Sequence, residues 1–370
     1  MQESLRKIAQ LLDFCFAPKE NERVLFLSDY PKGASSAEDE ERKSMFFEYY
    51  KAAEIVCRQR KCRLLPAVLY EQTGKHNAEL PKTATTLGGG YVNDLHELIA
   101  SCSIALAITK YSATAPLKNI ALKSGLRAIS MPSARRDMEG AILADYGRIS
   151  QRGERLIAAV EGAEGFEITF DGTGIPKGTM LYVDTRAKNW ILDGGLCRQA
   201  GQVINLPSGE VFTAPYEGLD MDAKKLFGES QTRGIWPIYS ENDGKVAFLH
   251  VQKNRIVRVV GNCQDAERIR QEIALEPEAA NIAEIGFGIN ENARGAIGIP
   301  ILEREKAGPH IAYGRNDHFG GAGAMVGKVK ANVHVDYVYT DQTPITATVF
   351  AVYKTGKRVL IAQRGKVVAV

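Results

Sequence analysis

The 370-residue sequence has few cysteines, and the six that it has are scattered. The closest pair, Cys57 and Cys62, is too widely spaced for a redox or zinc CxxC motif, so free thiols in a reducing compartment are expected. The chain also lacks the basic-then-apolar start of a secretory signal and any apolar run long enough to cross a membrane. These absences predict a cytoplasmic protein with no membrane partner.

An excess of charge of one sign is also missing. Forty-seven Lys and Arg residues face forty-four Asp and Glu residues, which leaves a net charge of only +3. That balance gives no electrostatic basis for binding nucleic acid. The glycine clusters at residues 88–90 and 194–195 do not have the spacing of a nucleotide-binding loop, so no nucleotide is expected either.

The first 160 residues alternate between helical and strand patterns. Short apolar runs predict buried strands at residues 23–29, 64–70, 104–109 and 127–131. Helical patterns fall between and around them, at residues 5–16, 39–60, 96–101, 117–124 and from 139 to about 160. Buried strands that alternate with helices are typical of a mostly parallel sheet covered by helices. We therefore expect an α/β N-terminal domain over residues 1–160.

Beyond about residue 165 the pattern changes to short alternating strands and glycine-rich turns. Strand patterns occur at residues 166–170, 180–184, 211–213 and 235–239, and two hairpins are expected over 246–260 and 358–370. One helix, at residues 265–275, interrupts them. Because 370 residues exceed what one core usually organises, we expect a second domain over residues 161–370, of the α+β class and rich in strands.

The sequence has only six histidines, and three of them lie close together, at His310, His318 and His334. Along a strand, the two-residue period puts the side chains of His334 and Asp336 on one face. Such a pair can chelate a metal ion, although hydrogen-bonded surface pairs have the same spacing. His310 could face the same pocket from a neighbouring strand.

Two carboxylates lie in segments where exposure to solvent is not the obvious explanation. Glu284 is embedded in an apolar, glycine-rich stretch, so it needs either a metal ion or a salt-bridging arginine. Glu210 follows a Pro-Ser-Gly turn, and this pattern alone is typical of a structural turn.

Four motifs occur in a fixed order, at residues 205–215, 283–290, 310–314 and 334–336. Together they resemble motifs of the thermophilic metallo-aminopeptidase family that includes aminopeptidases T and S. The order of four spaced motifs is more specific than any one of them. The resemblance runs from about Phe166 to Tyr337, whereas the N-terminal domain matches only in architecture.

This resemblance implies a homodimeric enzyme that hydrolyses N-terminal peptide bonds at a centre of two divalent metal ions. The family ligands correspond to Glu210, Glu284, His310, His334 and Asp336, and Glu210 and Glu284 are also catalytic candidates. Zinc, cobalt or manganese suits this mixture of oxygen and nitrogen ligands. The substrate would be a peptide or another small molecule.

The chain departs from the family at one position. A metal-site tyrosine falls seven residues after the first histidine in the family, and here that position is Asp317, followed by His318. Either side chain could replace the ligand or act as a base, and we take His318 as a catalytic candidate. Otherwise this segment is a loop whose polar groups contact only water.

Two other functions follow from the same residues. The fold also resembles that of ring-cleaving dioxygenases acting on dihydroxypyridines, in which one iron could be held by His334, Asp336 and either His310 or His318. Glu210 and Glu284 argue against this function, because their charges would repel each other without a second cation. A non-catalytic binding subunit with the same fold is the third hypothesis, and five intact ligands argue against it. Hydrolysis is therefore favoured.

Overall fold

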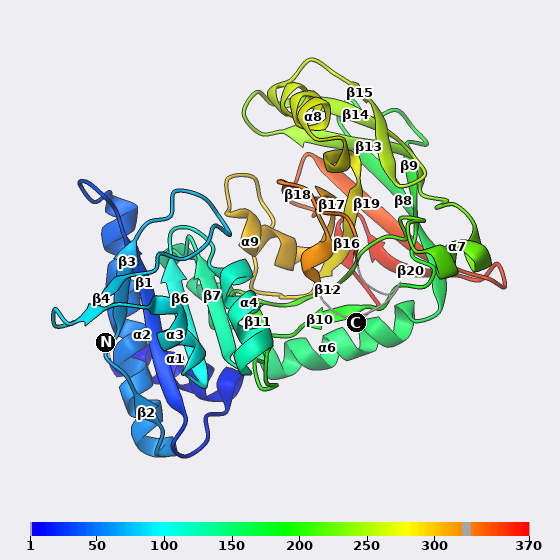
Figure 1. The fold of residues 1–370 in the computed structure, drawn as a ribbon. Helices are drawn as coiled ribbons and strands as arrows, with labels where there is room; N and C mark the ends of the chain where they lie inside the picture. The colour runs from blue at the N-terminus through cyan, green and yellow to red at the C-terminus, as the bar shows by residue number, and fades with distance from the viewer. Residues whose placement is uncertain (1, 320–326, 370) are drawn as a thin grey trace. The chain divides into compact units, whose positions relative to one another are not determined.

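The computed structural model describes residues 2–319 and 327–369, apart from the side chains of Gln2 and His318. The chain forms two compact units (Figure 1). The first unit contains the residues up to Tyr146 together with Asp193–Ser208, and the second contains Gly147–Leu192 and the residues from Gly209 onward. Each unit is therefore built from two separate segments of the sequence.

The first unit is built around a mostly parallel sheet, in the order β11-β7-β6-β1-β3-β4-β5, with β2 also paired to β1. Its strands are β1 (Arg23–Tyr30), β2 (Arg63–Leu64), β3 (Val68–Glu71), β4 (Ala84–Thr86), β5 (Tyr91–Val92), β6 (Ile104–Thr109), β7 (Arg127–Pro132) and β11 (Val203–Asn205). The pairs among β11, β7, β6, β1, β2 and β3 are parallel, and only β4 and β5 run antiparallel. The predicted fold class, with a mostly parallel sheet, is confirmed.

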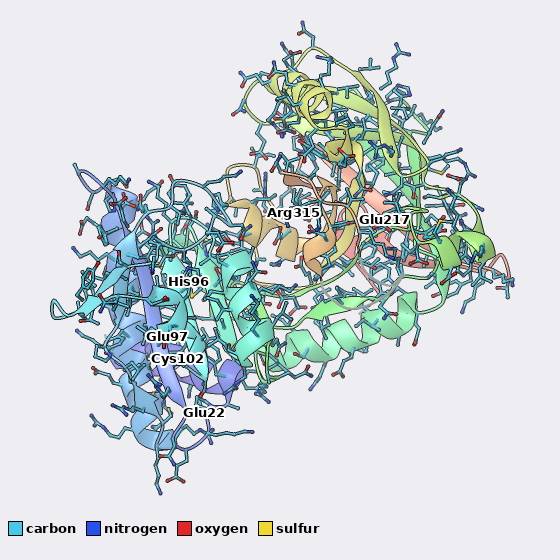
Figure 2. The ribbon with its side chains drawn as sticks, viewed as in Figure 1. Glu22, His96, Glu97, Cys102, Glu217 and Arg315 are labelled. Atoms are coloured by element: carbon cyan, nitrogen blue, oxygen red, sulfur yellow. The ribbon has the colours of Figure 1, made fainter. Side chains whose placement is uncertain are left out.

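Helices accompany this sheet, as the alternating pattern predicted. They are α1 (Gln2–Phe16), α2 (Ala37–Arg60), α3 (Leu95–Ala100) and α4 (Thr114–Ser124). A capping box between Ser36 and Asp39 starts α2, because each side chain bonds the backbone N–H of the other. All six residues of β6 are buried, which explains its continuous apolar run. An ion pair of 2.6 Å joins Arg127 of β7 to Glu22, and Glu22 is labelled in Figure 2.

The single long helix predicted from residue 139 to about 160 is wrong. A short helix, α5 (Glu139–Ile142), follows the 3₁₀ turn η1 (Arg136–Met138), and α6 (Tyr146–Val160) begins after a break. Leu143 ends α5 outside the helical region of φ and ψ. Asp145 stands directly before α6, where a short acidic side chain favours a new helix start over continuation of the old one.

The second unit contains an antiparallel sheet in the order β15-β14-β13-β9-β8-β19-β20-β21. These strands are β8 (Ala163–Gly172), β9 (Met180–Asp184), β13 (Arg233–Ser240), β14 (Lys245–Gln252), β15 (Arg255–Val260), β19 (Ile345–Tyr353), β20 (Arg358–Gln363) and β21 (Lys366–Val367). Buried and less buried residues alternate along β19, as expected for a strand with one face on a core. Both predicted hairpins are present, as β14–β15 and β20–β21.

A second sheet of this unit carries the predicted site. It has the order β10-β12-β16-β17-β18, and its strands are β10 (Ile191–Asp193), β12 (Glu210–Thr213), β16 (Ile282–Gly288), β17 (Pro309–Gly314) and β18 (His334–Val338). The longer helices of the unit besides α6 are α8 (Gln264–Leu275), α7 (Met221–Phe227) and α9 (Ile301–Arg304). Within the described residues, every helix of the protein is too short or too polar to span a lipid bilayer.

Candidate metal centre

The register of four neighbouring strands gathers the predicted ligands on one face of this sheet. Glu210 lies opposite Gly288, and His310 lies opposite Gly286. Asp336 and His334 lie opposite Ala312 and Gly314 of β17, and Ala312 in turn pairs with Glu284. Since side chains of a strand alternate between faces, Glu210, Glu284, His310, His334 and Asp336 all project from the same side.

Small residues leave room for these ligands. The positions between them on the same face are glycine or alanine, at Gly286, Gly288, Ala312 and Gly314. Gly286 is the tightest of them, because a Cβ atom there would lie 2.0 Å from Nε2 of His310. The His310 ring therefore lies directly over the bare backbone of β16.

Gly286→Ala is accordingly expected to weaken metal binding by roughly 10- to 100-fold, the range seen when the support of a ligand is disturbed. The added methyl group must turn the buried His310 ring away from the two glutamates, while the sheet itself can still form. Competition against a chromogenic zinc chelator measures the affinity. Gly33→Ala, where a Cβ meets nothing within 4 Å, is the control. Unchanged affinity in Gly286→Ala would contradict the role given to the His310 ring.

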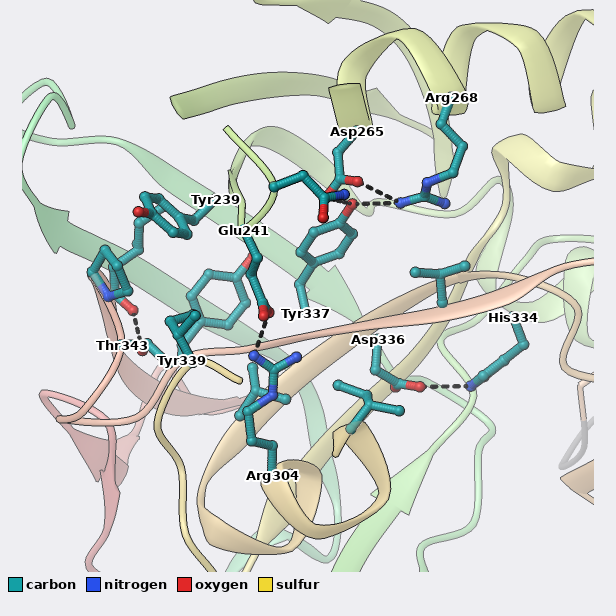
Figure 3. A pocket seen from close by; sticks show the side chains of 17 residues that line it. Tyr239, Glu241, Asp265, Arg268, Arg304, His334, Asp336, Tyr337, Tyr339 and Thr343 are labelled. Carbon is teal, nitrogen blue, oxygen red and sulfur yellow. Dashed lines mark hydrogen bonds and ion pairs between the residues drawn. The ribbon is translucent and has the colours of Figure 1, made fainter. Parts of the chain in front are cut away.

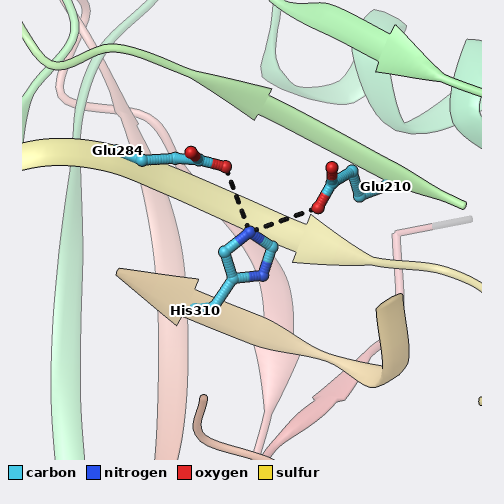
Figure 4. A group of neighbouring side chains, drawn as sticks. All are labelled: Glu210, Glu284 and His310. Atoms are coloured by element: carbon cyan, nitrogen blue, oxygen red, sulfur yellow. Dashed lines mark hydrogen bonds and ion pairs between the residues drawn. The ribbon is translucent and has the colours of Figure 1, made fainter. Parts of the chain in front are cut away.

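Glu210, Glu284 and His310 form the first of two ligand groups (Figure 4). Nε2 of His310 lies 3.2 Å from Oε1 of Glu284 and 3.4 Å from Oε2 of Glu210. All three side chains are buried. One nitrogen and two oxygens thus converge on one point from three strands.

Glu284, His334 and Asp336 form the second group. Nε2 of His334 lies 3.3 Å from Oε2 of Glu284 and 3.6 Å from Oδ2 of Asp336. Glu284 therefore belongs to both groups, with Oε1 directed at one histidine and Oε2 at the other. A carboxylate in this position could offer one oxygen to an ion in each group.

Both histidines are held in the orientation that metal ligation requires. Nδ1 of His310 donates to the carbonyl of Gly308 at 3.2 Å, and Nδ1 of His334 donates to the carbonyl of Arg315 at 2.7 Å. Because each Nδ1 carries the proton, each Nε2 is the nitrogen that can offer a lone pair to an ion. Backbone carbonyls commonly fix ligating histidines in this way.

The charges of the site favour bound cations. Burial disfavours a charged His310, but its hydrogen bond with Glu284 and the charge of Glu210 outweigh burial and raise its pKa to about 9. At His334 the charge of Asp336 and the bond with Glu284 likewise outweigh burial and raise the pKa to about 10. Burial would raise the pKa of Glu284, yet its bonds with both histidines hold that pKa well below its usual range. In the metal-free site the two protonated rings therefore supply the positive charge that balances these carboxylates, and bound metal ions would supply it instead.

The donor set fits a pair of divalent ions. In each group the candidate ligand atoms lie within 4.8 Å of one another. Oε2 of Glu210 is buried, makes no hydrogen bond among the described residues and lies 3.4 Å from Nε2 of His310, so it is incompletely satisfied unless another group binds it. A metal ion in the first group would do so. Imidazole nitrogen with carboxylate oxygen suits zinc, cobalt or manganese.

Two residues next to these ligands were missed by the sequence reasoning. Nζ of Lys306 lies 2.5 Å from Oε1 of Glu210 and 2.7 Å from Oε1 of Glu305, and the lysine is 1% exposed. Lys306 thus occupies one oxygen of Glu210 and leaves only Oε2 for an ion. Burial raises the pKa of Glu305, although Lys306 opposes the shift. The sequence feature that could have indicated them is the adjacent pair Glu305 and Lys306, which lies shortly before His310.

Lys306→Met is expected to lower the free energy of unfolding of the metal-free protein by about 3–5 kcal/mol, because it leaves two buried carboxylates without their cation. Denaturant titration in the presence of a chelator measures this. Lys366→Met is the control, since Lys366 pairs with Asp341 on the surface and should contribute less than about 1 kcal/mol. Equal losses in the two variants would show that Lys306 has no special role.

Asp317 and His318 were predicted to supply a replacement ligand or a base, and the structure describes the side chain of only the first. Asp317 is half-buried in the 3₁₀ turn η4 (Asp317–Phe319), and its carboxylate accepts a 3.0 Å hydrogen bond from Nε of Arg315. It belongs to neither ligand group. The side chain of His318 lies outside the described residues, so its catalytic role stays a prediction. The next residue, Phe319, packs against the His334 ring at 5.8 Å between centroids.

A buried carboxylate supports the backbone that holds His334. Glu217 accepts hydrogen bonds from Nδ2 of Asn316 at 2.9 Å and from the backbone N–H of Lys328 at 3.1 Å. Asn316 follows Arg315, whose carbonyl binds His334, and both Glu217 and Arg315 are labelled in Figure 2. Lys188 neutralises Glu217 at 2.5 Å. Sequence patterns did not indicate this support, because its parts lie 29 to 111 residues apart.

A pocket of about 360 Å³ reaches the second ligand group (Figure 3). His334 and Asp336 contribute to its lining, together with aromatic and aliphatic side chains such as Tyr239, Tyr337 and Ile301. Its charged residues are Glu241, Asp265, Arg268 and Arg304. A small molecule bound there would contact two of the candidate ligands.

Comparison with known proteins shows the fold. No family description matches the sequence, and no curated protein matches it. The structure is similar to 2,5-dihydroxypyridine dioxygenase from Pseudomonas putida KT2440, with a TM-score of 0.67, 15% identity, and 99% of this chain and 97% of that chain covered. It is also similar to AmpT from Thermus thermophilus, with a TM-score of 0.64, 16% identity and 99% of each chain covered. At these identities the likeness establishes a shared two-unit fold, common to an aminopeptidase and a dioxygenase.

Proposed function

We propose that this protein is a metal-dependent aminopeptidase that hydrolyses N-terminal peptide bonds at a centre of two divalent ions. The observation that carries the proposal is the position of Glu284, whose two oxygens each face a separate histidine and which belongs to both ligand groups. The four ordered motifs support it as well, since they resemble those of aminopeptidases T and S. AmpT shares the fold over nearly the full length of both chains.

Two bound ions would lower the pKa of a water molecule between them and polarise the scissile carbonyl. The protein residues supply the geometry. Glu284 spans the two positions, Lys306 fixes which oxygen of Glu210 is available, and backbone carbonyls orient His310 and His334. Asp336 faces the pocket, where its negative charge favours the free ammonium group of a peptide N-terminus.

The dioxygenase function is less well supported by the geometry. A single iron would need His334, Asp336 and either His310 or His318 as one compact triad. Among the described residues His310 groups with Glu210 and Glu284 instead, and the side chain of His318 lies outside the described residues. A one-iron site also has no use for the buried Glu210, whose Oε2 makes no hydrogen bond among the described residues and lies 3.4 Å from Nε2 of His310. Retention of both glutamates therefore favours two ions over one.

Metal analysis with matched substrates tests the proposal. The protein, purified without chelators and reconstituted with zinc, cobalt or manganese, should hold two ions per chain and release leucine from leucyl peptides. One iron per chain with oxygen consumption on 2,5-dihydroxypyridine would favour the dioxygenase instead. A protein that binds no metal and turns over neither substrate would favour the non-catalytic binding subunit. A homodimer is also proposed, and analytical ultracentrifugation tests it.

A further inference from the structure

The pocket beside the metal centre contains a buried cation that is incompletely paired. Arg304, the last residue of α9, is 9% exposed and lines the pocket together with Glu241 and Asp336. Its Nη1 donates to Glu241, whereas its buried Nε has no hydrogen-bond partner among the described residues. A guanidinium has five N–H donors, so Arg304 retains donors for another acceptor.

Arg268, the other arginine that lines the pocket, already has several hydrogen-bond partners. Nη1 of Arg268 donates to Glu272 and to the hydroxyl of Tyr313, and its Nη2 donates to Asp265 and to the hydroxyl of Tyr337. Four side chains therefore hold Arg268 as part of the pocket wall. Arg304 is the arginine of this pocket that is suited to binding a ligand.

The partner of Arg304 leaves space for a competing anion. The Glu241 side chain is 37% exposed, whereas that of Arg304 is 11% exposed. Figure 3 shows the guanidinium pointing into the pocket, with Glu241 on one side of it. Because Glu241 can turn toward water at little cost, a ligand carboxylate can share the guanidinium or replace Glu241 there. Such a ligand would also satisfy donors that are now buried without a partner.

We propose that Arg304 binds the C-terminal carboxylate of a short peptide, so that the enzyme selects di- and tripeptides with a free carboxylate. The inference rests on the proposed function, which places the N-terminal amine and first peptide bond at His334 and Asp336. Both lie in the same pocket as Arg304. The volume of about 360 Å³ is at the small end of the range for ligand sites, which suits a short peptide.

Two substitutions should change the carboxylate preference in opposite directions. L-leucyl-glycine and L-leucyl-glycinamide are compared as substrates of the zinc-reconstituted protein. The wild type is expected to favour the acid over the amide by about tenfold or more in kcat/KM, the usual effect of a charged hydrogen bond. Arg304→Gln should abolish this preference, whereas Glu241→Gln should increase it by removing the competing carboxylate. If the Arg304–Glu241 ion pair were only structural, Arg304→Gln and Glu241→Gln would not change the acid-over-amide preference in opposite directions.

Further variants keep the test independent of folding. Arg304→Lys retains the charge but not the forked donors, and it should keep part of the preference. Arg358→Gln is the matched control. Arg358 lies on β20 and, like Arg304, pairs with one glutamate, here Glu167, so its loss should leave the preference for the acid unchanged. Equal kcat/KM for acid and amide in the wild type would overturn the inference, as would a preference that survives Arg304→Gln.

Binding measured without turnover separates this inference from the proposed function. Non-hydrolysable reduced-amide analogues of the two dipeptides are titrated into the metal-loaded protein by calorimetry. If the acid analogue binds more tightly in an Arg304-dependent manner but no peptide is hydrolysed, the carboxylate site stands and the aminopeptidase function fails. If peptides are hydrolysed while acid and amide analogues bind equally, the aminopeptidase function stands and the carboxylate site fails.

Discussion

Glu284→Gln is expected to lower peptide hydrolysis by about 10³-fold or more and to reduce the metal content from two ions per chain to one. An amide has one oxygen where the carboxylate has two, so it can face either His310 or His334 but cannot serve both ion positions. Loss of one ion removes several kcal/mol of transition-state stabilisation, and about 4 kcal/mol corresponds to a thousandfold.

The measurement combines metal analysis with kinetics on one protein preparation. Glu267→Gln is the control, because Glu267 lies on the exposed face of α8 and pairs only with neighbouring residues of that helix. It should retain two ions and full activity. Full activity in Glu284→Gln would rule out Glu284 as an essential ligand and would remove the main support for a two-ion centre.

Metal affinity is expected to rise steeply with pH and to level off above about pH 10. His310 and His334 have pKa values raised to about 9 and about 10, so both rings carry protons at pH 7 and must release them before they can ligate. Burial raises the pKa of Glu210 to about 8, so this ligand also carries a proton at pH 7. Each released proton adds about one unit of log affinity per pH unit, so the product of the two binding constants should rise about 1000-fold per unit below pH 8 and about 100-fold per unit between pH 8 and pH 9. The direction follows from proton competition, which weakens binding as the pH falls.

Titration in chelator-buffered zinc from pH 6 to pH 9 measures this dependence, and calorimetry in buffers of different ionisation enthalpy counts the released protons. About three protons per chain should be released at pH 7, from His310, His334 and Glu210. An affinity that does not change over this range would show that the histidines are already neutral in the metal-free protein. In that case the carboxylates of Glu284 and Asp336 would not raise the pKa values of the two histidines.

The candidate ligands could be proposed from sequence because four motifs, each weak alone, occur in an order that resembles a known family. The two-residue period of a strand placed His334 and Asp336 on one face, and the structure has them 3.6 Å apart through Nε2 and Oδ2. An apolar surrounding marked Glu284 as a carboxylate that needs a partner, and it lies between two histidines. The choice between a metal ion and an arginine could not be made from the segment alone.

The residues that support the ligands could not be identified in this way. Lys306 reaches Glu210 across 96 positions, and Glu217 reaches Asn316 across 99. Such contacts depend on strand pairing and leave no local period. The role of Gly286 was also hidden, because only the register of β16 with β17 puts His310 above it.

The fold was more predictable in class than in detail. Alternating helices and apolar strands indicated the parallel sheet, since both features are local. The three-residue strand β11 was missed because Val203–Asn205 is too short to show a period, although it pairs with β7. The break between α5 and α6 was missed because apolar residues continue through it, and only Asp145 marks the new start.

The central claim is that Glu284 bridges two metal ions, and a crystal structure of the zinc-loaded protein tests it most directly. Anomalous scattering at the zinc edge should give two peaks about 3.5–4 Å apart, each about 2.0–2.2 Å from a different oxygen of Glu284. One peak should lie with Glu210 and His310, and the other with His334 and Asp336. A single peak held by His310, His334 and Asp336, with Glu284 unbound, would contradict the claim.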